Sequence, residues 1–527
     1  MLPILAASVS APCRVGWTSR RRSLQGSWRS RACGGACRPA SVRGYQYHEG
    51  LMLTAVLLYL SILVLIGTVR SRRVKTGDDF LVAGRTLPAR VLVFTLLATW
   101  IGSGSLFGGA GLGYRAGFPA LWQSAGAWAG IALVYFIAPR VRRIAQYTVP
   151  DILELRYGPT ARVLGTVTTV LAYATIAAYQ FRGGGRLLAL IAPVDPDTGA
   201  LITMVFCVVF TALAGMLSIA YLDVGNGTLM TVGVTLAVIF MVGDVGGLGA
   251  ALAALPVQHV SVFGTLGPQA SLALFLPTMF LLLGEANMYQ KFFSARDERA
   301  ARLAVGGWIV GTMVVETLID ATGILASAST PGLTDAQSEE IVIRVATDVL
   351  PDFMGVILVC GAAAIIVSTA NSFLLTPSTN LIRDVYQRFI NPDVTNRQLI
   401  AYTRAIVVLL GVLGYIAGNF FPTILEMALW AYTMYGAGIT PALLGALLWR
   451  RATRQGGVAS IFVGMGTTLA WEVVGRIRTV DGVPGYLFGL ETAYPALALS
   501  IGTLVVVSLL TPAQSEEEAA PLLGEAR

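Results

Sequence analysis

The sequence contains little charge and almost no histidine. Charged residues make up 13% of its 527 residues, hydrophobic residues make up 55%, and His48 and His259 are its two histidines. So apolar a composition excludes a soluble globular protein of two or three domains. The sequence also lacks a nucleophile-base motif, a phosphate-binding loop and a cluster of metal-ligating residues, so we do not expect an enzyme.

Positive charge is nearly confined to the start of the chain. The formal net charge is +8, and residues 1–48 hold eight arginines and no acidic residue, so the remainder is neutral (8 − 8 = 0). A neutral remainder gives no support for nucleic-acid binding. We interpret residues 1–48 as a disordered basic leader or as the result of a wrongly assigned start, with Met52 as the true initiator. The alternative is an organellar transit peptide, which has the same Arg-rich, acid-poor composition.

Cysteine is also scarce. Three of the five cysteines lie in the leader, and the other two, Cys207 and Cys360, lie in apolar segments. This distribution predicts neither a disulfide framework nor a metal site.

Long apolar runs, in contrast, are abundant. Thirteen segments carry little or no charge and are long enough to cross a bilayer as α-helices. They predict an all-α polytopic membrane protein that has the lipid bilayer as a partner, and they give no indication of the oligomeric state. The segments are residues 51–69, 91–114, 118–138, 163–191, 200–220, 224–247, 268–290, 303–327, 350–376, 398–419, 422–449, 457–475 and 490–511.

Basic residues in the connections predict the orientation. Arg140, Arg142 and Arg143 are among many basic residues in the connections that lie inside if the N-terminus lies outside. Positive charge favours the cytoplasmic side of a membrane. We therefore expect an integral protein of the plasma (inner) membrane, with the N-terminus outside and a short acidic cytoplasmic tail at residues 512–527.

The second span is rich in glycine. The stretch TLLATWIGSGSLFGGAGLGYRAG begins at Thr95 and places seven glycines between Gly102 and Gly117. Glycine permits close helix packing, so a tight helix interface is one interpretation. The other is a helix that is broken in the middle of the membrane, with freed backbone carbonyls that coordinate a cation.

A polar stretch follows the apolar run of the ninth span. STANSFLLTPSTNLIRD, residues 368–384, places eight hydroxyl or amide side chains within thirteen residues. On a helix Ser368 and Ser372 share a face, as do Thr369, Ser372 and Thr376, so their hydroxyl oxygens can converge. Uncharged oxygen ligands suit a hard monovalent ion such as sodium. The alternative is that each hydroxyl bonds to its own helix, as is routine for Ser and Thr in membranes.

Five motifs give the chain a resemblance to a known family. From about residue 51 to 470 it resembles the sodium:solute symporter family, which includes sodium/proline, sodium/glucose and choline transporters. The motifs occur in the order and at the spacing of the family. They are DDFLVAGRTLP (78–88), YTVPDILELRYG (147–158), YQKFFSARDERAAR (289–302), STANSFLLTPSTNLIRDVY (368–386) and GITPALLGALLWRRAT (438–453).

The resemblance implies a fold and a sodium site. It implies two inverted five-helix repeats, residues 91–247 and 268–449, preceded by one helix at 51–69 and followed by two helices within 457–511. The first core helix of this fold is broken. By motif position, sodium is expected as the co-transported ion, without an organic cofactor. Its ligands are expected to be the backbone carbonyls of Ala98, Ile101 and Ile365 and the hydroxyls of Ser368 and Thr369.

Other polar residues in the spans are candidates for contact with the solute. Glu285 lies near a position where some family members contact substrate, and an ionisable group at that depth indicates function or a pairing partner. Its other interpretation is a structural ion pair, perhaps with Arg182, or a neutral hydrogen-bonded acid. The same cavity is expected to be lined by a set of polar and aromatic side chains, namely Trp100, Gln123, Ser124, Tyr179 and Gln180. Trp100 departs from the sodium/proline pattern, in which the matching residue is an acid.

Three further acids are candidates for an ion path or charge pair. Asp223 matches a family aspartate at the inner end of the fifth core helix, which the resemblance associates with ion passage. Glu316 and Asp320 lie four residues apart on one helix face, where two like charges repel unless one is protonated or matched elsewhere.

Together these observations predict a secondary transporter. We expect it to couple inward sodium movement to the import of a small polar organic solute by alternating access. Glu285 favours a solute with an amine or quaternary ammonium, while a sugar, a carboxylate and a vitamin stay open. The alternatives are a proton-coupled transporter that uses Glu316, Asp320 or Glu285, and a non-transporting solute sensor or scaffold that retains the fold.

Overall fold

The computed structural model describes residues 43–71, 82–144, 146–479, 484–515 and 522. Contacts divide the chain after Gly44, and the unit of residues 45–527 contains the helices discussed below. The predictions for most of the basic leader, for the start of DDFLVAGRTLP and for most of the acidic tail lie outside the described residues.

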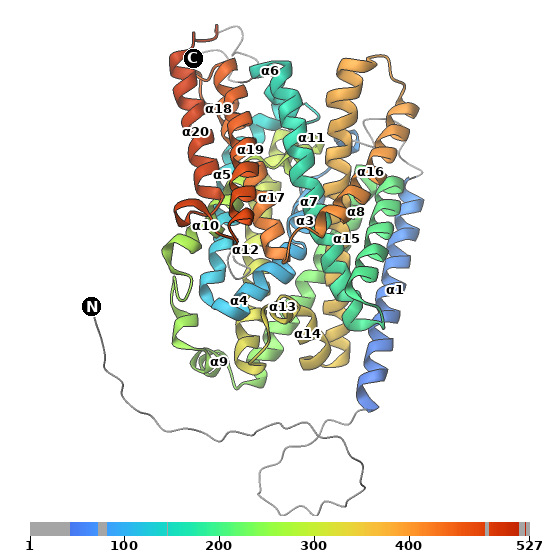
Figure 1. Cartoon of the computed structure of the whole chain (residues 1–527). Helices are drawn as coiled ribbons and strands as arrows, with labels where there is room; N and C mark the ends of the chain where they lie inside the picture. Colours follow the sequence, from blue (N-terminus) through green and yellow to red (C-terminus); the bar gives the residue numbers. More distant parts are fainter. Residues whose placement is uncertain (1–42, 72–81, 145, 480–483, 516–521, 523–527) are drawn as a thin grey trace, which may run out of the picture. The chain divides into compact units, whose positions relative to one another are not determined.

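The first half of the described chain forms long helices joined by short helical turns. Within residues 45–527 the long helices lie side by side, with α6 near one end and α9 near the other (Figure 1). The elements are α1 (Arg43–Ser71), η1 (Ala83–Arg85), α3 (Ala89–Trp100), η2 (Gly104–Gly109), α4 (Ala110–Ala116), η3 (Phe118–Ala120), α5 (Leu121–Ile144), α6 (Val149–Tyr157), α7 (Pro159–Ile191), α8 (Pro196–Asp244), α9 (Leu248–Ala254) and η4 (Val257–Val260).

The second half repeats this pattern of long helices and short turns. Its elements are α10 (Gly267–Gly284), α11 (Ala286–Ser294), α12 (Glu298–Ser329), α13 (Asp335–Glu339), α14 (Ile341–Arg344), η5 (Val345–Val349), α15 (Asp352–Asn380), η6 (Leu381–Ile390), α16 (Asn396–Gly418), α17 (Ile424–Gly438), α18 (Thr440–Leu448), α19 (Arg454–Ile477), η7 (Leu487–Gly489) and α20 (Ala493–Leu510). The one bridge of β type recorded in the described ranges joins Leu87 to Ala295.

The predicted spans are confirmed. Twelve helical segments of the described chain are long and apolar enough to cross a membrane, two of them within α8, and the pair Ala89–Trp100 and Gly104–Ala116 adds a thirteenth span with a bend of 53°. This bent pair is the glycine-rich segment, so the predicted broken helix is confirmed as well. The helix of the ninth span continues to Ile390, fourteen residues beyond the predicted end at 376.

The seventh span is also broken, which the sequence did not predict. α10 ends at Gly284, and Glu285 (φ −62°, ψ 110°) separates it from α11. Two hydroxyl groups donate to the carbonyl oxygens that the break frees: Tyr289 of α11 donates to Leu283 at 2.9 Å, and Tyr435 of α17 donates to Gly284 at 2.8 Å. Satisfying freed carbonyls in this way is what allows a helix to break inside a membrane.

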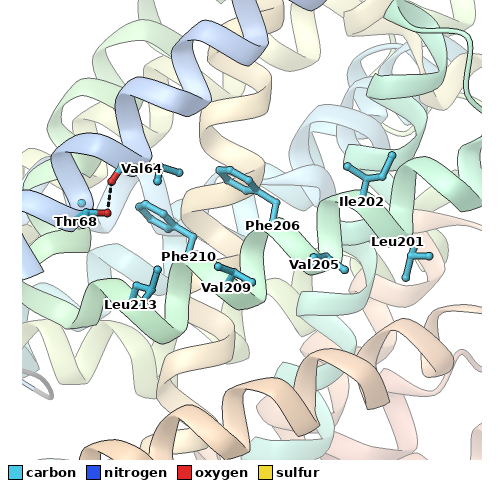
Figure 2. A pocket seen from close by; sticks show the side chains of 10 residues that line it. Val64, Thr68, Leu201, Ile202, Val205, Phe206, Val209, Phe210 and Leu213 are labelled. Atoms are coloured by element: carbon cyan, nitrogen blue, oxygen red, sulfur yellow. Dashed lines mark hydrogen bonds between the residues drawn. The ribbon is translucent and has the colours of Figure 1, made fainter.

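A groove of about 520 Å³ lies between α1 and α8. Figure 2 shows the apolar side chains of α8 that line it, among them Val205, Phe206 and Phe210. Thr68, a polar residue of this lining, donates its hydroxyl to the carbonyl oxygen of Val64 at 2.7 Å. Since Val205 is 50% exposed, this side of α8 faces the surroundings of the protein. The groove therefore offers little to recognise a polar solute, and the search for a site turns to the broken helices.

Candidate cation and solute sites

The break in the first bent span is centred on Gly102. α3 ends at Trp100, and Ile101 has an extended backbone (φ −71°, ψ 125°). A Cβ at Gly102 would lie 2.8 Å from Gln180 Nε2 and 3.0 Å from Thr369 Cγ2. Because glycine has no Cβ, α7 and α15 can approach the broken backbone this closely.

Thr369 on α15 reaches across to the broken backbone. Its hydroxyl lies 2.7 Å from the carbonyl oxygen of Ile101 and 3.2 Å from that of Ala98. One hydroxyl and two carbonyl oxygens thus converge, and such oxygens are the ligands of hard cations. Ile365 lies one turn earlier on the same helix and is buried.

Ser368, the remaining predicted sodium ligand, bonds to Asp223. Its hydroxyl donates to one carboxylate oxygen of Asp223, and the hydroxyl of Thr95 donates to the other. All three side chains are buried, in α15, α8 and α3 respectively. The structure therefore brings Asp223 next to the predicted sodium ligands rather than to the solute residues.

Lys291 is a member of this region that sequence reasoning missed. It is fully buried in α11, and its ammonium donates to the hydroxyl of Thr99, which in turn lies 3.1 Å from that of Ser372. Electrostatic attraction links Lys291 to Asp223 and Glu285. Its signal was present in the motif YQKFF, where a lysine follows an apolar span whose one charged residue is Glu285, but the motif suggested an inner loop.

Trp100 faces an acidic and aromatic group. Its indole donates to Glu316 at 2.7 Å, and the indole of Trp128 donates to the other oxygen of Glu316 at 3.1 Å. The ring of Trp100 lies 5.7 Å from that of Tyr432, centroid to centroid. The hydroxyl of Tyr432 lies 3.4 Å from that of Tyr179. Trp128 and Tyr432 were not predicted, because an aromatic residue in an apolar span gives no signal of its own.

Gln180 binds the broken backbone directly. Its side-chain oxygen accepts a hydrogen bond of 2.8 Å from the amide of Ser103. Within the described ranges, the Nε2 of Gln180 and the hydroxyl of Ser103 have no hydrogen-bond partner although both are buried. Polar groups of this kind are expensive to bury unless something binds them.

Gln123 and Ser124 on α5 lie against the same span. Ser124 donates to Asp320 at 2.7 Å. A Cβ at Gly109 would lie 3.0 Å from the other oxygen of Asp320 and 4.0 Å from Gln123 Oε1. The structure thus gathers five predicted solute residues around the broken span, together with Glu316 and Asp320; the five are Trp100, Gln123, Ser124, Tyr179 and Gln180.

Glu285 and Arg182 do not pair with each other, which corrects that possibility. Glu285 begins α11, where its carboxylate accepts from the amides of Asn287 at 3.3 Å and Met288 at 2.9 Å and from the hydroxyl of Tyr173. Arg182 instead donates to backbone carbonyls, among them that of Gly418 at 2.9 Å. The break at Glu285 explains the difference, since the freed helix start offers amides to the acid.

Helix α7 carries an ion-pair cluster near each end. At its start, Arg162 pairs with three acids: Asp151, Glu154 and Asp384. Burial raises the pKa of Glu154. Hydrogen bonds from Arg162 and Arg388 together lower this pKa by more than burial raises it, so it lies below its ordinary value.

At the other end of α7, Arg186 pairs with Glu339 of α13, whose side chain is fully buried. The two arginines are 24 residues apart, about 36 Å along a helix. Each cluster therefore joins α7 to other segments at opposite ends of the helix.

Comparison with known proteins adds an independent finding. The model of the sodium:solute symporter family matches residues 80–464. The sodium/proline symporter of Escherichia coli (strain K12) is 24% identical over 486 residues, which cover 88% of this chain and 94% of that protein. The sodium/pantothenate symporter of the same organism is 28% identical over 442 residues, 78% of this chain and 89% of that protein.

Solved structures share the fold. The substrate-bound, outward-open structure of a Na⁺-coupled sialic acid symporter superposes with a TM-score of 0.72 at 16% identity, over 88% of this chain and 98% of that chain. A nucleobase-cation-symport-1 family transporter in a closed conformation gives a TM-score of 0.52 at 14% identity, over 84% and 97%. The helices described above therefore share the inverted-repeat fold of these two transporters.

Proposed function

The chain belongs to the sodium:solute symporter family, and from this we propose that it imports a small polar organic solute by coupling it to inward sodium movement through alternating access. One sodium ion that moves down a membrane potential gains about 2.3 kcal/mol per 100 mV. Tenfold accumulation of an uncharged solute requires about 1.4 kcal/mol. One sodium ion per solute is therefore enough for substantial uptake.

The observation that supports the proposed sodium site is the position of Thr369. Its hydroxyl lies within hydrogen-bonding distance of the carbonyl oxygens of both Ala98 and Ile101, at the break of the first core helix. We propose that sodium binds these three groups together with the carbonyl of Ile365 and the hydroxyl of Ser368. The ion would hold the broken helix against α15, and its release would loosen that contact.

Around Trp100 lie the residues that we propose bind the solute. The group of Gln123, Ser124, Tyr179 and Gln180 adjoins the same broken span and includes buried polar atoms without partners in the described chain. The relatives named above transport proline and pantothenate, so both are the first solutes to test. Two inverted repeats at residues 91–247 and 268–449 would place this group between them.

The experiment compares thermal unfolding of the purified protein in sodium chloride and potassium chloride at equal ionic strength. We expect a sodium-specific rise in Tm that the variant Ser368→Ala/Thr369→Ala loses. The matched control is Ser378→Ala/Thr379→Ala, on the same helix, because these hydroxyls bond to the carbonyls of Leu374 and Leu375 in their own helix. The control should keep the sodium response.

Two results would count against the proposal. Equal Tm in both salts would exclude a stabilising sodium site, and uptake that stops when the proton gradient is collapsed would favour proton coupling.

We also propose that the protein lies in the plasma (inner) membrane with its N-terminus outside and its C-terminus in the cytoplasm. The basic residues in the connections support this orientation.

A further inference from the structure

A tyrosine of α1 reaches a buried side chain of another helix. Tyr59 is half-buried, and its hydroxyl donates to the side-chain oxygen of Asn226 on α8 at 2.7 Å. The hydroxyls of Thr54 and Ser61, which also lie on α1, bond instead to carbonyl oxygens of their own helix. Tyr59 therefore joins α1 to α8 through a directed polar contact.

Asn226 connects Tyr59 to Asp223. The two residues of α8 are three positions apart, a spacing that places their side chains on one face of the helix. The side chain of Asn226 forms a hydrogen bond with the carboxylate of Asp223. An amide side chain offers an oxygen that accepts and a nitrogen that donates. Since the oxygen of Asn226 accepts from Tyr59, its nitrogen is the group that donates to the carboxylate.

The carboxylate of Asp223 in turn holds hydroxyl groups of two other helices. It accepts from Ser368 on α15 through one oxygen and from Thr95 on α3 through the other. The side chains of Asn226, Asp223, Ser368 and Thr95 are all at most 3% exposed. In so buried a network, bulk water does not replace a lost hydrogen-bond partner. A displacement of one member therefore affects the others.

The hydrogen bond to Asp223 also decides how Ser368 can serve a cation. A hydroxyl group has one hydrogen and two lone pairs, and it binds a cation through a lone pair. Donation to Asp223 engages the hydrogen of Ser368, so the lone pairs stay available for the proposed sodium ion. If the carboxylate turned away, the hydroxyl could rotate and bond to its own helix, as serines in membrane helices commonly do.

Helix α1 contributes no residue to the proposed sodium site. Within residues 45–527 it lies at the edge of the group of helices (Figure 1). Two grooves with a mostly apolar lining, of about 520 and 360 Å³, lie between α1 and its neighbours, which include α8 and α15. Apolar contacts have no preferred direction, whereas a hydrogen bond sets both a distance and an angle. Tyr59 therefore fixes the position of α1 against α8 beside these grooves.

We propose that Tyr59 is a positioning residue for sodium. Through Asn226 it holds Asp223 where the carboxylate orients the hydroxyl of Ser368 for the ion. The affinity for sodium thus depends on α1, a helix outside the proposed repeats at residues 91–247 and 268–449. This inference rests on the proposed function, because it requires a sodium ion at Ser368.

The test measures the dissociation constant of sodium for the purified full chain. It is obtained from the rise of Tm with sodium chloride concentration, in mixtures with potassium chloride at constant ionic strength. The variants are Tyr59→Phe, which removes only the hydroxyl, Asn226→Leu, which removes the amide, and the double variant. Ser61→Ala is the matched control, because it removes a hydroxyl of α1 that bonds within the same helix at 2.7 Å. Tm in potassium chloride alone reports any loss of stability that is unrelated to sodium.

Tyr59→Phe should raise the dissociation constant of sodium about threefold to tenfold, the effect expected for one hydrogen bond. Ser61→Ala should leave it within about twofold. Asn226→Leu should raise it at least as much as Tyr59→Phe does. In the double variant the tyrosine substitution should add nothing further, because Tyr59 acts through the amide. Should Asn226→Leu fail to fold, Asn226→Ala also removes the amide and takes its place.

Two results would overturn this inference alone. The first is a dissociation constant in Tyr59→Phe within about twofold of that of the original protein, whatever the Tm in potassium chloride. The second is a double variant in which the two effects multiply, since Tyr59 would then act independently of Asn226. An original protein without any sodium response would refute the proposed function and this inference together. That result is seen before any variant is compared, so the two failures are distinguishable.

Discussion

Lys291 illustrates how a single residue sets the charge balance of the core. Its ammonium is fully buried and donates to Thr99, beside the proposed sodium site. Asp223 and Glu285 are the acids whose charge it offsets. A buried charge is tolerated when charges of opposite sign lie near it, and removing one partner leaves the others uncompensated.

We therefore predict that Lys291→Met destabilises the protein by about 1–3 kcal/mol or more, because the buried acids near it lose a compensating charge. The change is measured as a fall in Tm in sodium buffer. The double variant Asp223→Asn/Lys291→Met removes a charge of each sign and should recover part of the loss. If Lys291→Met unfolds at the temperature of the original protein, the lysine does not offset these acids.

The glycine at the break of the first core span acts at the scale of the element. Gly102 lies where α3, α7 and α15 meet, and an added methyl group would press on Gln180 and Thr369. Both side chains hold the broken backbone, through the amide of Ser103 and the carbonyl of Ile101. Crowding at this point should disturb the sodium site and the solute site together.

The prediction is that Gly102→Ala costs about 1–3 kcal/mol of stability and weakens the sodium-induced rise in Tm. Gly225→Ala is the matched control, since a Cβ at this position of α8 has no atom within 4 Å. Replacing that helical glycine should be neutral or stabilise by about 0.5–1 kcal/mol. An unchanged sodium response in Gly102→Ala would show that the close approach is not needed.

The two broken spans show how far the sequence predicts the elements. The first break was predicted because seven glycines between Gly102 and Gly117 weaken helix geometry locally. The second break, at Glu285, was not, because it depends on partners distant in sequence. Tyr435 bonds to a carbonyl that the break frees, and Tyr173 bonds to the acid. No local sequence pattern indicates such partners.

The residues of the candidate sites likewise fall into those that the sequence predicts and those that depend on distant contacts. Motif order led to Thr369 and the two carbonyls that it contacts, and hydropathy alone was enough to predict thirteen spans. The position of Glu285 at the start of α11 was not predicted, and neither were Lys291 and Tyr432, while contact of Glu285 with the solute stays a prediction. Their roles depend on which helices pack together, which periodicity and composition do not specify.

At the scale of the whole molecule, the cluster around Arg162 links α6, α7 and the end of the long helix of the ninth span. Burial raises the pKa of Glu154, and hydrogen bonds from Arg162 and Arg388 lower it to below the ordinary value of 4.5. A lowered pKa means that the folded protein favours the charged acid. Its contribution to stability is therefore present above about pH 4.5 and is lost as the pH falls through the folded pKa.

We predict that Glu154→Gln lowers Tm at pH 7 and that the difference from the original protein shrinks when the pH falls below 4.5. The measurement is thermal unfolding of both proteins across this range at constant salt. Glu340→Gln serves as a control, because Glu340 pairs with Arg344 of its own neighbourhood and not with the cluster. A difference that stays constant with pH would show that the charge of Glu154 does not matter.

Because ion pairs hold α7 near both of its ends, we expect the two ends to open at different rates. Arg162 is bound by three acids at one end, whereas Arg186 is bound by one at the other. A carrier that opens one end at a time has to separate these contacts in turn, and the larger cluster has more to separate. The Arg186 end should therefore open sooner and more often. Without any ion gradient, the protein should spend most of its resting time accessible from that end, and each turnover should wait longest on the opposite one.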